Sequence, residues 1–387
     1  MKKKLCVVTA TRAEYGLLKP IIVKLASSLA FEVQVAVTGA HLSAEFGLAY
    51  REIEKDGIII HKKIEMLLSS DTPAAISKSM GLALISFGEY FAESRPDAVL
   101  LLGDRYETLA VACAAMNEEI PIIHLHGGET TEGAVDEAVR HAVTKMSYLH
   151  MASTEEHRRR IIQMGEEPDR VFCVGAMGVE NALHTNLMEK EELEKDLQVR
   201  LDVPYGIVTF HPVTLEKDRA TEQMEELLKA LEEFPDWKFL MTKANADKGG
   251  RVINQMLGSY ALSHDNVRVY DSLGMVRYLS AVKYSHMVIG NSSSGLIEAP
   301  SFHVPTVNIG DRQKGRIRAD SVIDCSPERA AIIKAMKKAG DAQFRQGLAE
   351  VANPYGNGNT SDRIIEILEE RLCGAEIDLK KHFCDII

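Results

Sequence analysis

Short apolar runs alternate strictly with segments of helical periodicity, and this alternation restricts the fold more than any other feature of the sequence. In the first half, runs rich in Val, Ile and Leu predict buried strands at Leu5–Thr9, Val33–Thr38, Ile58–Ile64, Ala98–Leu102 and Ile120–His124. The segments between these runs, such as Ala44–Lys55 and Gly133–Met146, carry helical patterns. Strand, helix and strand in this order indicate βαβ units and therefore a parallel sheet.

A second series of the same kind begins after a polar, highly charged stretch at residues 185–202. Its predicted strands are Gly206–Phe210, Trp237–Thr242, Asn266–Tyr270, His286–Ile289 and Val304–Ile309. The sequence therefore predicts an α/β protein of two doubly wound parallel-sheet domains, residues 1–175 and 176–360. The last periodic segment, about 361–387, follows a turn-rich stretch, so we expect the final helix to pack back on the first domain.

Composition excludes several classes of partner. The 387 residues contain 45 Lys and Arg against 56 Asp and Glu, and a net charge of −11 gives no general attraction to nucleic acid or to an anionic membrane. No stretch approaches the ~18 apolar residues that a membrane span needs. The six cysteines form no CxxC pair and have no metal-type spacing, which favours buried thiols in a reducing cytoplasm.

Polar residues follow the predicted strands of the first half, where open α/β sheets place their ligand residues. Arg12 lies in the turn before the first helix, a good setting for a diphosphate. No GxGxxG motif is present, so the sequence does not predict dinucleotide binding. Asp104 and Arg105 follow the most apolar strand, where an acid and an Arg are costly unless they are paired or functional.

The next predicted strand ends in a segment with two histidines, two glycines and several carboxylates within 14 residues. Glu129 and Asp136 can donate or accept protons there. His124 and His126 occupy alternate strand positions that point to opposite faces, and no third ligand has helpful spacing, so no metal site is predicted.

In the second half, His211 ends the first strand, and Pro212 fixes a turn that directs the imidazole outward. Residues 290–298 carry three serines before a predicted helix, and their N–H and O–H groups suit a phosphate, with Glu298 able to reach a sugar hydroxyl. Residues 310–318 hold four cations, which suits an anionic ligand in an acidic protein.

Taken in order, these motifs resemble the UDP-N-acetylglucosamine 2-epimerase family. The resemblance covers almost the whole chain and is carried by TRAEYG (11–16), TGAHL (38–42), GDR (103–105), HGGETTEGAVDEAVRHAVTK (126–145), FHPVT (210–214), NAD (245–247), GNSSSG (290–295), GDRQKGR (310–316) and NPYGNG (353–358). Within the family, the chain looks most like the hydrolysing enzymes of sialic and legionaminic acid pathways. Non-hydrolysing members have Glu-Ala-Gly where this chain has His126-Gly127-Gly128, and Glu129 is the candidate to replace that Glu.

The resemblance implies two Rossmann-like domains in a GT-B arrangement, with the substrate in an interdomain cleft and no nicotinamide or other cofactor. It implies UDP contacts from Arg12, Gly16, Arg105, Asn245, Ser292, Ser293 and Ser294 and sugar contacts from His41, His126, Glu298 and Arg312. Asp104, Glu129, Asp136 and His211 are the expected catalytic residues, with base and acid among the carboxylates unassigned. The protein is expected to be a cytoplasmic homodimer or homotetramer.

The implied reaction converts UDP-N-acetylglucosamine and water to N-acetylmannosamine and UDP through a 2-acetamidoglucal. UDP-2,4-diacetamido-2,4,6-trideoxyglucose is an alternative substrate. Two other functions also fit a nucleotide-sugar fold: a GT-B glycosyltransferase and a nucleotide-sugar sensor without turnover. The clustered carboxylates disfavour the sensor, because a binding protein needs few titratable groups near its ligand.

Overall fold

The computed structural model describes residues 2–70, 72–132, 134–213, 219–244, 249–374 and 377–385. By its internal contacts, the chain divides into two compact units. Unit 1 comprises residues 1–129, 136–181 and 355–387, and unit 2 comprises 130–135 and 182–354. The predicted bounds place residues 130–135 in the first domain, whereas the contacts assign them to unit 2. The main part of unit 2 begins at residue 182, within the helix Met177–His184, and not at residue 176.

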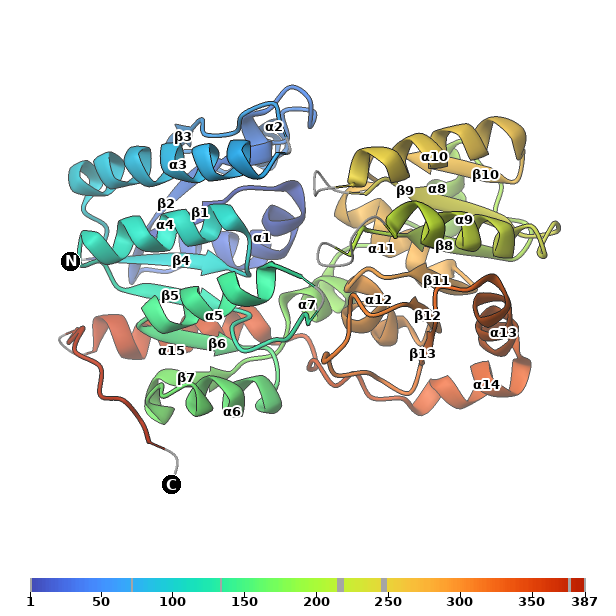
Figure 1. Cartoon of the computed structure of the whole chain (residues 1–387). Coiled ribbons are helices and arrows are strands. Elements are labelled where there is room, and N and C mark those ends of the chain that lie inside the picture. The colour runs from blue at the N-terminus through green and yellow to red at the C-terminus, as the bar shows by residue number, and fades with distance from the viewer. Residues whose placement is uncertain are drawn as a thin grey trace. The chain divides into compact units, whose positions relative to one another are not determined.

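Unit 1 is built on a seven-stranded parallel sheet with the order β3-β2-β1-β4-β5-β6-β7 (Figure 1). The strands are β1 (Lys3–Thr9), β2 (Phe31–Thr38), β3 (Lys62–Ile64), β4 (Ala98–Leu102), β5 (Ile122–Leu125), β6 (Leu149–Ala152) and β7 (Val171–Cys173). The prediction of a parallel sheet is confirmed. β3 is shorter than predicted, and β6 and β7 were not predicted.

Helices cover both faces of this sheet. They are α1 (Arg12–Ser27), α2 (Tyr50–Lys55), α3 (Pro73–Ser94), α4 (Tyr106–Asn117), α5 (Asp136–Met146), α6 (Glu155–Gln163), α7 (Met177–His184) and α15 (Thr360–Leu368). One apolar core joins the sheet to α1 and α15, and a second joins it to α3, α4 and α5, which lie side by side in Figure 1. The helix predicted from Ala44 begins only at Tyr50, because Gly47 and Leu48 have positive φ and end any continuous helix there.

The C-terminal residues return to unit 1. In α15 and the turn that follows it, Ile364, Leu368 and Leu372 are buried in the core that also contains α1. Glu180, which is almost fully buried, accepts hydrogen bonds from the backbone N–H and the hydroxyl of Ser361 and pairs with Lys24 of α1.

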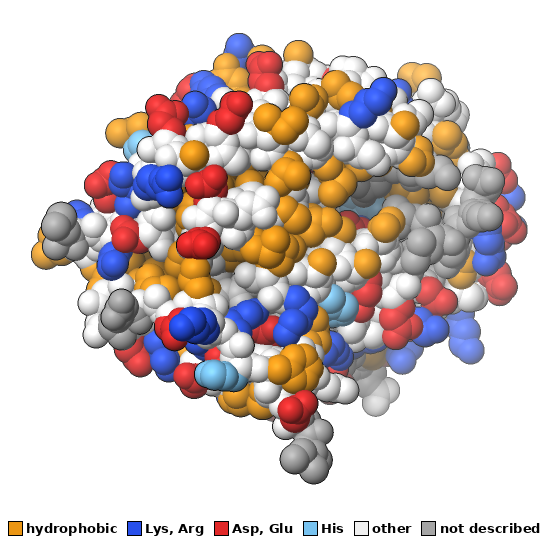
Figure 2. All heavy atoms as spheres, turned by 60° about the vertical axis from the view of Figure 1, so that its left-hand side comes forward, with side chains coloured by type: hydrophobic (Ala, Val, Ile, Leu, Met, Phe, Trp, Pro, Cys, Tyr) orange, Lys and Arg blue, Asp and Glu red, His pale blue; other side chains and the backbone are white. Residues whose placement is uncertain are grey.

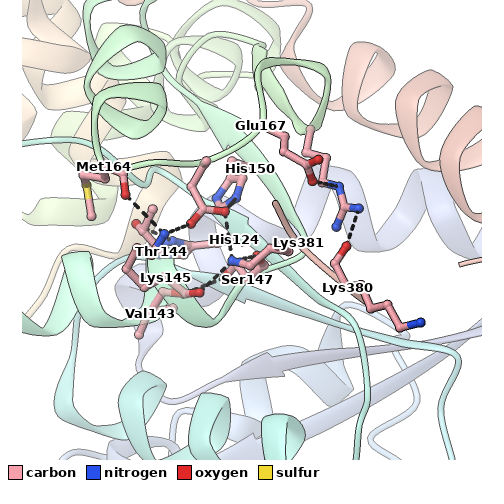
Figure 3. Close-up of polar contacts among 12 residues, drawn as sticks. His124, Val143, Thr144, Lys145, Ser147, His150, Met164, Glu167, Lys380 and Lys381 are labelled. Carbon is pink, nitrogen blue, oxygen red and sulfur yellow. Dashed lines mark hydrogen bonds and ion pairs between the residues drawn. The ribbon is translucent and has the colours of Figure 1, made fainter. Parts of the chain in front are cut away.

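Beyond α15, Lys381 attaches the C-terminal segment to unit 1 through polar contacts (Figure 3). Glu166, whose side chain is 1% exposed, accepts hydrogen bonds from His150 Nε2 at 3.0 Å, from Lys145, and from Lys381 Nζ at 2.9 Å. Lys381 Nζ also donates to the backbone oxygens of Lys145 and Ser147. Burial raises the pKa of Glu166, but these three hydrogen bonds outweigh burial and lower it to about 2.

Unit 2 is built on a six-stranded parallel sheet with the order β10-β9-β8-β11-β12-β13. Its strands are β8 (Tyr205–Thr209), β9 (Lys238–Thr242), β10 (Val267–Tyr270), β11 (Met287–Gly290), β12 (Thr306–Ile309) and β13 (Val322–Cys325). Its helices are α8 (Lys190–Leu197), α9 (Ala220–Leu231), α10 (Gly250–Ser263), α11 (Gly274–Tyr284), α12 (Ser294–Ile297), α13 (Arg329–Gly340) and α14 (Ala342–Gly347). The core formed with α9, α10 and α13 is separate from the core formed with α8 and α11, so this sheet is also covered on both faces.

The surface carries charges of both signs, as expected from a composition with similar numbers of basic and acidic residues. Figure 2 shows one face of the molecule, on which Lys and Arg side chains are interspersed with Asp and Glu. Among the described residues, no helix is both long and apolar enough to cross a membrane.

All six cysteines are free. Only Cys6 is buried, four are partly exposed and Cys373 is exposed, so the expectation of mostly buried thiols was wrong.

Candidate active site

The candidate residues lie in each unit at the carboxyl ends of the parallel strands. In unit 1 the strand order reverses between β1 and β4, and in unit 2 it reverses between β8 and β11. Ligands of open α/β sheets bind outside the carboxyl ends of strands at such switch points. Arg12 and Asp104 follow β1 and β4, while His211 and Ser292 follow β8 and β11, so the sequence-predicted residues flank both switch points.

Arg12 is the first residue of α1, and local sequence fixes that position. Thr11 caps the helix by accepting a hydrogen bond from Glu14 N, and the Glu14 side chain accepts from Thr11 N, which completes a capping box. Arg12 NH2 forms an ion pair with Glu52 Oε1 at 3.0 Å, whereas its Nε is buried with no hydrogen-bond partner in the described part of the chain. An unpaired buried N–H on a cation at a helix start suits an anionic ligand oxygen.

His41 lies in the 3-10 helix Gly39–Leu42 that directly follows β2. Its side chain is fully buried, and Nε2 lies 3.1 Å from Thr9 Oγ1. Burial, with a smaller contribution from the Arg12 charge, lowers the pKa of His41 to about 4. The imidazole is therefore neutral at pH 7, which fits a hydrogen-bonding role better than a charge-pairing role.

Asp104 and Glu129, from the ends of two neighbouring strands, are joined by one fully buried arginine. Arg140 of α5, 1% exposed, binds the Asp104 carboxylate and donates to the Glu129 backbone oxygen at 2.9 Å. It also pairs with Glu137 Oε2 at 3.0 Å. The structure thus brings Asp104 and Glu129 to one arginine. Arg140 was not predicted as a site residue; the available signal was a lone arginine on the helix face that also carries Val143.

The turn after β5 has a constrained backbone that fixes Glu129. His126 has φ 63°, which is uncommon for a residue with a side chain and marks local strain. Gly128 has φ 74°, and a Cβ there would lie 2.4 Å from the backbone oxygen of His157, so only glycine fits. His126 Nδ1 lies 3.3 Å from Glu129 Oε1, and the Glu129 residue is 2% exposed.

Two residues that the sequence did not single out complete this turn. Ser153, directly after β6, donates its hydroxyl to Glu129 Oε1 at 2.8 Å, and its Oγ lies 2.9 Å from His157 Nδ1. Both residues are buried, at 1% and 0% exposure. In the sequence, only their position after β6 could have indicated them, and β6 was not predicted.

The three remaining predicted site residues of unit 1 are Arg105, Gly16 and Asp136, and each has different contacts. Arg105 caps the start of α4 and donates to both carboxylate oxygens of Glu107. Gly16 lies inside α1, where its backbone oxygen accepts a hydrogen bond from Asn181 Nδ2 at 2.8 Å, a contact that attaches α7. Asp136 is the half-buried first residue of α5.

In unit 2, the central residue is Asn291. Its Oδ1 accepts from His211 N at 2.7 Å, and its Nδ2 donates to the His211 backbone oxygen at 2.8 Å. Both residues are buried, at 1% and 7% exposure. Gly290, with φ 130°, permits this approach, because a Cβ there would lie 2.0 Å from the Thr209 oxygen. Asn291 was part of a predicted motif but was not predicted as a site residue.

The cationic loop after β12 packs on the same asparagine. Arg312 NH1 and Gln313 Nε2 donate to the Asn291 backbone oxygen at 3.1 and 2.8 Å. His211 and Arg312 are thereby brought together through Asn291, and the three serines follow it directly.

The serine segment differs in detail from the prediction. Ser292, Ser293 and Ser294 are partly exposed. The helix predicted after the serines is present but short and irregular, because α12 begins at Ser294 and ends at Ile297, and a 3-10 helix follows at Ala299–Phe302. The backbone N–H groups of Gly295 and Leu296 already donate to the Ser292 and Ser293 backbone oxygens, so the serine hydroxyls carry more of any phosphate binding. Asn245 lies outside the described residues.

Across the described part of the chain, no group of three or more His, Cys, Asp or Glu side chains could hold a metal ion. His124 is instead occupied by hydrogen-bond partners, with Nε2 2.7 Å from the Gly103 oxygen and Nδ1 3.3 Å from Thr144 Oγ1. Burial lowers the pKa of His124 to about 3, so this ring is neutral at pH 7.

Comparison with known proteins identifies the family. The model of the UDP-N-acetylglucosamine 2-epimerase family matches residues 23–369. The chain belongs to this family. The Campylobacter jejuni GDP/UDP-N,N'-diacetylbacillosamine 2-epimerase (hydrolyzing) is 41% identical over 386 residues, covering 100% of both chains. The Escherichia coli polysialic acid biosynthesis protein P7 is 40% identical over 382 residues, covering 98% of this chain and 97% of the relative.

The fold agrees with this family. The crystal structure of UDP-GlcNAc 2-epimerase from Neisseria meningitidis bound to UDP-GlcNAc matches with a TM-score of 0.81 and 20% identity, covering 95% of this chain and 100% of that chain. The predicted fold class of two Rossmann-like parallel-sheet domains is confirmed, as is the resemblance to the hydrolysing branch of the 2-epimerase family. Neither a glycosyltransferase nor a sensor without turnover is favoured by these relatives.

Proposed function

We propose that this 2-epimerase family member hydrolyses a UDP-N-acetylhexosamine with inversion at carbon 2. UDP-N-acetylglucosamine and water give N-acetylmannosamine and UDP. The observation that supports the chemistry most directly is Arg140, which binds the Asp104 carboxylate and the Glu129 backbone oxygen and so links the two turns that carry these acids. Full-length similarity to an enzyme named as hydrolysing supports the same reaction class.

Unit 2 binds the nucleotide diphosphate in this proposal. His211, held by Asn291, and the hydroxyls of Ser292, Ser293 and Ser294 contact the phosphates, with Asn245 expected to assist. Hydrogen bonds and positive charge directed at the departing diphosphate stabilise the negative charge that develops as the C–O bond breaks. Arg12 and Arg105, at the strand ends of unit 1, supply further cationic groups, and Arg312 and Glu298 bind the sugar.

Unit 1 carries the proton chemistry. Asp104, Glu129 or Asp136 removes the hydrogen of carbon 2 while the bond from carbon 1 to the diphosphate oxygen breaks, which releases UDP and leaves a 2-acetamidoglucal. A proton then adds to carbon 2 from the opposite face, and the oxygen of water adds to carbon 1. General-base assistance contributes roughly 100- to 10,000-fold. His126, whose Nδ1 lies 3.3 Å from Glu129 Oε1, and His41, which contacts Thr9 at the end of β1, are assigned to sugar contacts.

A second substrate is supported by two relatives. The 35% identical Legionella pneumophila protein is named a UDP-N,N'-diacetylbacillosamine 2-epimerase (hydrolyzing). The 41% identical Campylobacter jejuni protein is named for N,N'-diacetylbacillosamine, a sugar with acetamido groups at carbons 2 and 4. The same elimination and hydration would convert UDP-2,4-diacetamido-2,4,6-trideoxyglucose to its free 2-epimer. The two candidate sugars differ at carbons 4 and 6, away from the reacting bond.

Incubation of the purified protein with each UDP-sugar alone, followed by NMR of the products, tests this proposal. We expect equimolar UDP and a free 2-epimerised sugar, with the larger kcat/KM identifying the substrate. A UDP-sugar that epimerises without release of UDP, or that stays intact for hours at micromolar enzyme, would contradict the proposal. A requirement for an added acceptor sugar would instead identify a glycosyltransferase.

We further propose a cytoplasmic homodimer or homotetramer. Six free cysteines fit a reducing compartment. The oligomer rests on the family resemblance alone, and light scattering of the eluting protein tests it: a monomer at micromolar concentration would contradict it.

A further inference from the structure

Glu129 is connected to α6 by a buried chain of hydrogen bonds that the reaction does not itself require. The chain runs from Glu129 Oε1 to Ser153 Oγ at 2.8 Å and from Ser153 Oγ to His157 Nδ1 at 2.9 Å. All three residues are at most 2% exposed. None of the three residues lies on the turn that carries Asp104. The hydrogen bonds from Ser153 and His157 therefore hold Glu129 independently of its contact with Arg140.

The direction of these hydrogen bonds follows from the number of protons available. A serine hydroxyl has one proton, and an ionised carboxylate can only accept. Since Ser153 donates to Glu129, its oxygen must accept from His157, and His157 must carry its proton on Nδ1. On the other side, His126 Nδ1 faces Glu129 Oε1 at 3.3 Å, and His126 Nε2 accepts from Met177 N at 3.4 Å. His126 thus presents its Nδ1–H directly to Glu129, whereas His157 presents its Nδ1–H to Ser153, which donates in turn to Glu129.

The backbone keeps His157 in place. Thr154 caps α6 and accepts from His157 N at 3.2 Å, which fixes the first turn of the helix. The Gly128 backbone packs against the His157 oxygen so closely that a side chain is excluded, and Arg160 of the same helix donates to the Gly128 oxygen at 2.6 Å. The Glu129 turn and α6 therefore form one rigid piece.

We propose that Ser153 and His157 are positioning residues for Glu129: the His157 Nδ1–H orients the Ser153 hydroxyl, which holds the Glu129 carboxylate in its reactive orientation. This inference rests on the proposed catalytic role of Glu129. It predicts that the reaction depends on a hydroxyl at 153 and on an N–H donor at the Nδ1 position of residue 157, although neither residue touches the sugar.

The test compares Ser153→Ala with Ser153→Thr, and His157→Ala with His157→Asn. Thr retains the hydroxyl, and the Asn side-chain amide can place an N–H near the Nδ1 position. We expect S153A and H157A to lower kcat by roughly 10- to 100-fold, the range found when the partner behind a functional side chain is removed, with KM and UDP affinity changed less than about threefold. S153T and H157N should regain at least a third of wild-type kcat.

A pH profile separates positioning from a purely structural role. The charged and titratable groups around Glu129 are His126 on its own turn, Arg140 of α5, and His157 and Arg160 of α6. Loss of the Ser153 donor disfavours the carboxylate form of Glu129. The acid limb of kcat/KM should therefore move to higher pH in S153A and remain in place in S153T.

Ser79→Ala is the matched control, because Ser79 is also 1% exposed and its Oγ accepts one hydrogen bond, from Leu68 N at 3.1 Å. Its kcat and pH profile should equal those of the wild type. Glu129→Gln distinguishes the catalytic role of Glu129 from the positioning role of Ser153 and His157. If E129Q keeps wild-type kcat, the role of Glu129 is wrong; if E129Q is inactive while folded S153A matches S79A in kcat and pH profile, the positioning inference alone is overturned.

Discussion

Asn291 and His211 exchange two hydrogen bonds across the carboxyl ends of β11 and β8, so that one side-chain amide fixes the backbone on which the imidazole stands. The same residue accepts hydrogen bonds from Arg312 and Gln313 through its backbone oxygen. Asn291 therefore organises the candidate residues of unit 2 without being one of the predicted ligands.

Replacement of Asn291 by Ala should weaken UDP binding. The substitution leaves the buried N–H and C=O of His211 without these partners, a cost of about 1–3 kcal/mol in stability. We expect the Kd for UDP, measured by calorimetry, to rise roughly tenfold, which corresponds to about 1.4 kcal/mol. Asn266→Ala is the control, because Asn266 Nδ2 donates to the Trp237 oxygen at the amino ends of the strands. Equal UDP affinities for N291A and N266A would refute this role.

Arg140→Lys should impair both folding and catalysis. Lysine cannot reproduce the planar fork that binds Asp104, Glu137 and the Glu129 backbone together, and it leaves the partly buried carboxylates of Asp104 and Glu137 incompletely paired. We expect a loss of roughly 2–5 kcal/mol in the free energy of unfolding and kcat lowered at least about 100-fold. Arg158→Lys, at a partly exposed arginine paired with Glu155, should change stability by less than about 1 kcal/mol. Retention of wild-type kcat by R140K would count against the shared-arginine arrangement.

The Glu166 network predicts a specific dependence of stability on pH. The pKa of Glu166 is about 2 in the folded protein against 4.5 without the fold. Its stabilisation is therefore fully present above pH 4.5 and is lost as the pH falls toward 2. Glu166→Gln should lower the free energy of unfolding by roughly 2–4 kcal/mol at pH 7, and this deficit should shrink between pH 4.5 and 2. Urea unfolding across this range measures it.

The control for that experiment is Glu155→Gln. Glu155 is 55% exposed and pairs with Arg158, so its loss should cost less than about 1 kcal/mol at any pH. A deficit of E166Q that stays constant from pH 7 to pH 3 would show that packing explains the effect, rather than the hydrogen bond with His150 and charge pairing with Lys145 and Lys381.

The sequence predicted what depends on local pattern. Strands such as Ala98–Leu102 are continuous apolar runs that need no tertiary information, and the strand-end positions of Arg12, Asp104 and His211 follow from that alternation. β6 was missed because Leu149–Ala152 is four residues long and contains a fully buried His150, whose burial depends on Glu166 sixteen residues later.

The unpredicted site residues share a different cause. Arg140, Ser153 and Asn291 act through partners that a neighbouring strand or helix supplies: Asp104, Glu129 and His211. No short sequence pattern encodes those pairings, because they depend on the order of strands in the sheets. Tertiary pairing, rather than residue type, distinguishes these polar side chains from ordinary helix or loop residues.

The most direct test of the central claim is the reaction in deuterated water and, separately, in ¹⁸O-labelled water. Elimination and hydration predict one deuterium at carbon 2 of the released sugar and no ¹⁸O in the UDP, because the C–O bond breaks and the proton at carbon 2 comes from solvent. Retention of the original hydrogen at carbon 2, or incorporation of ¹⁸O into the UDP phosphate, would contradict the account.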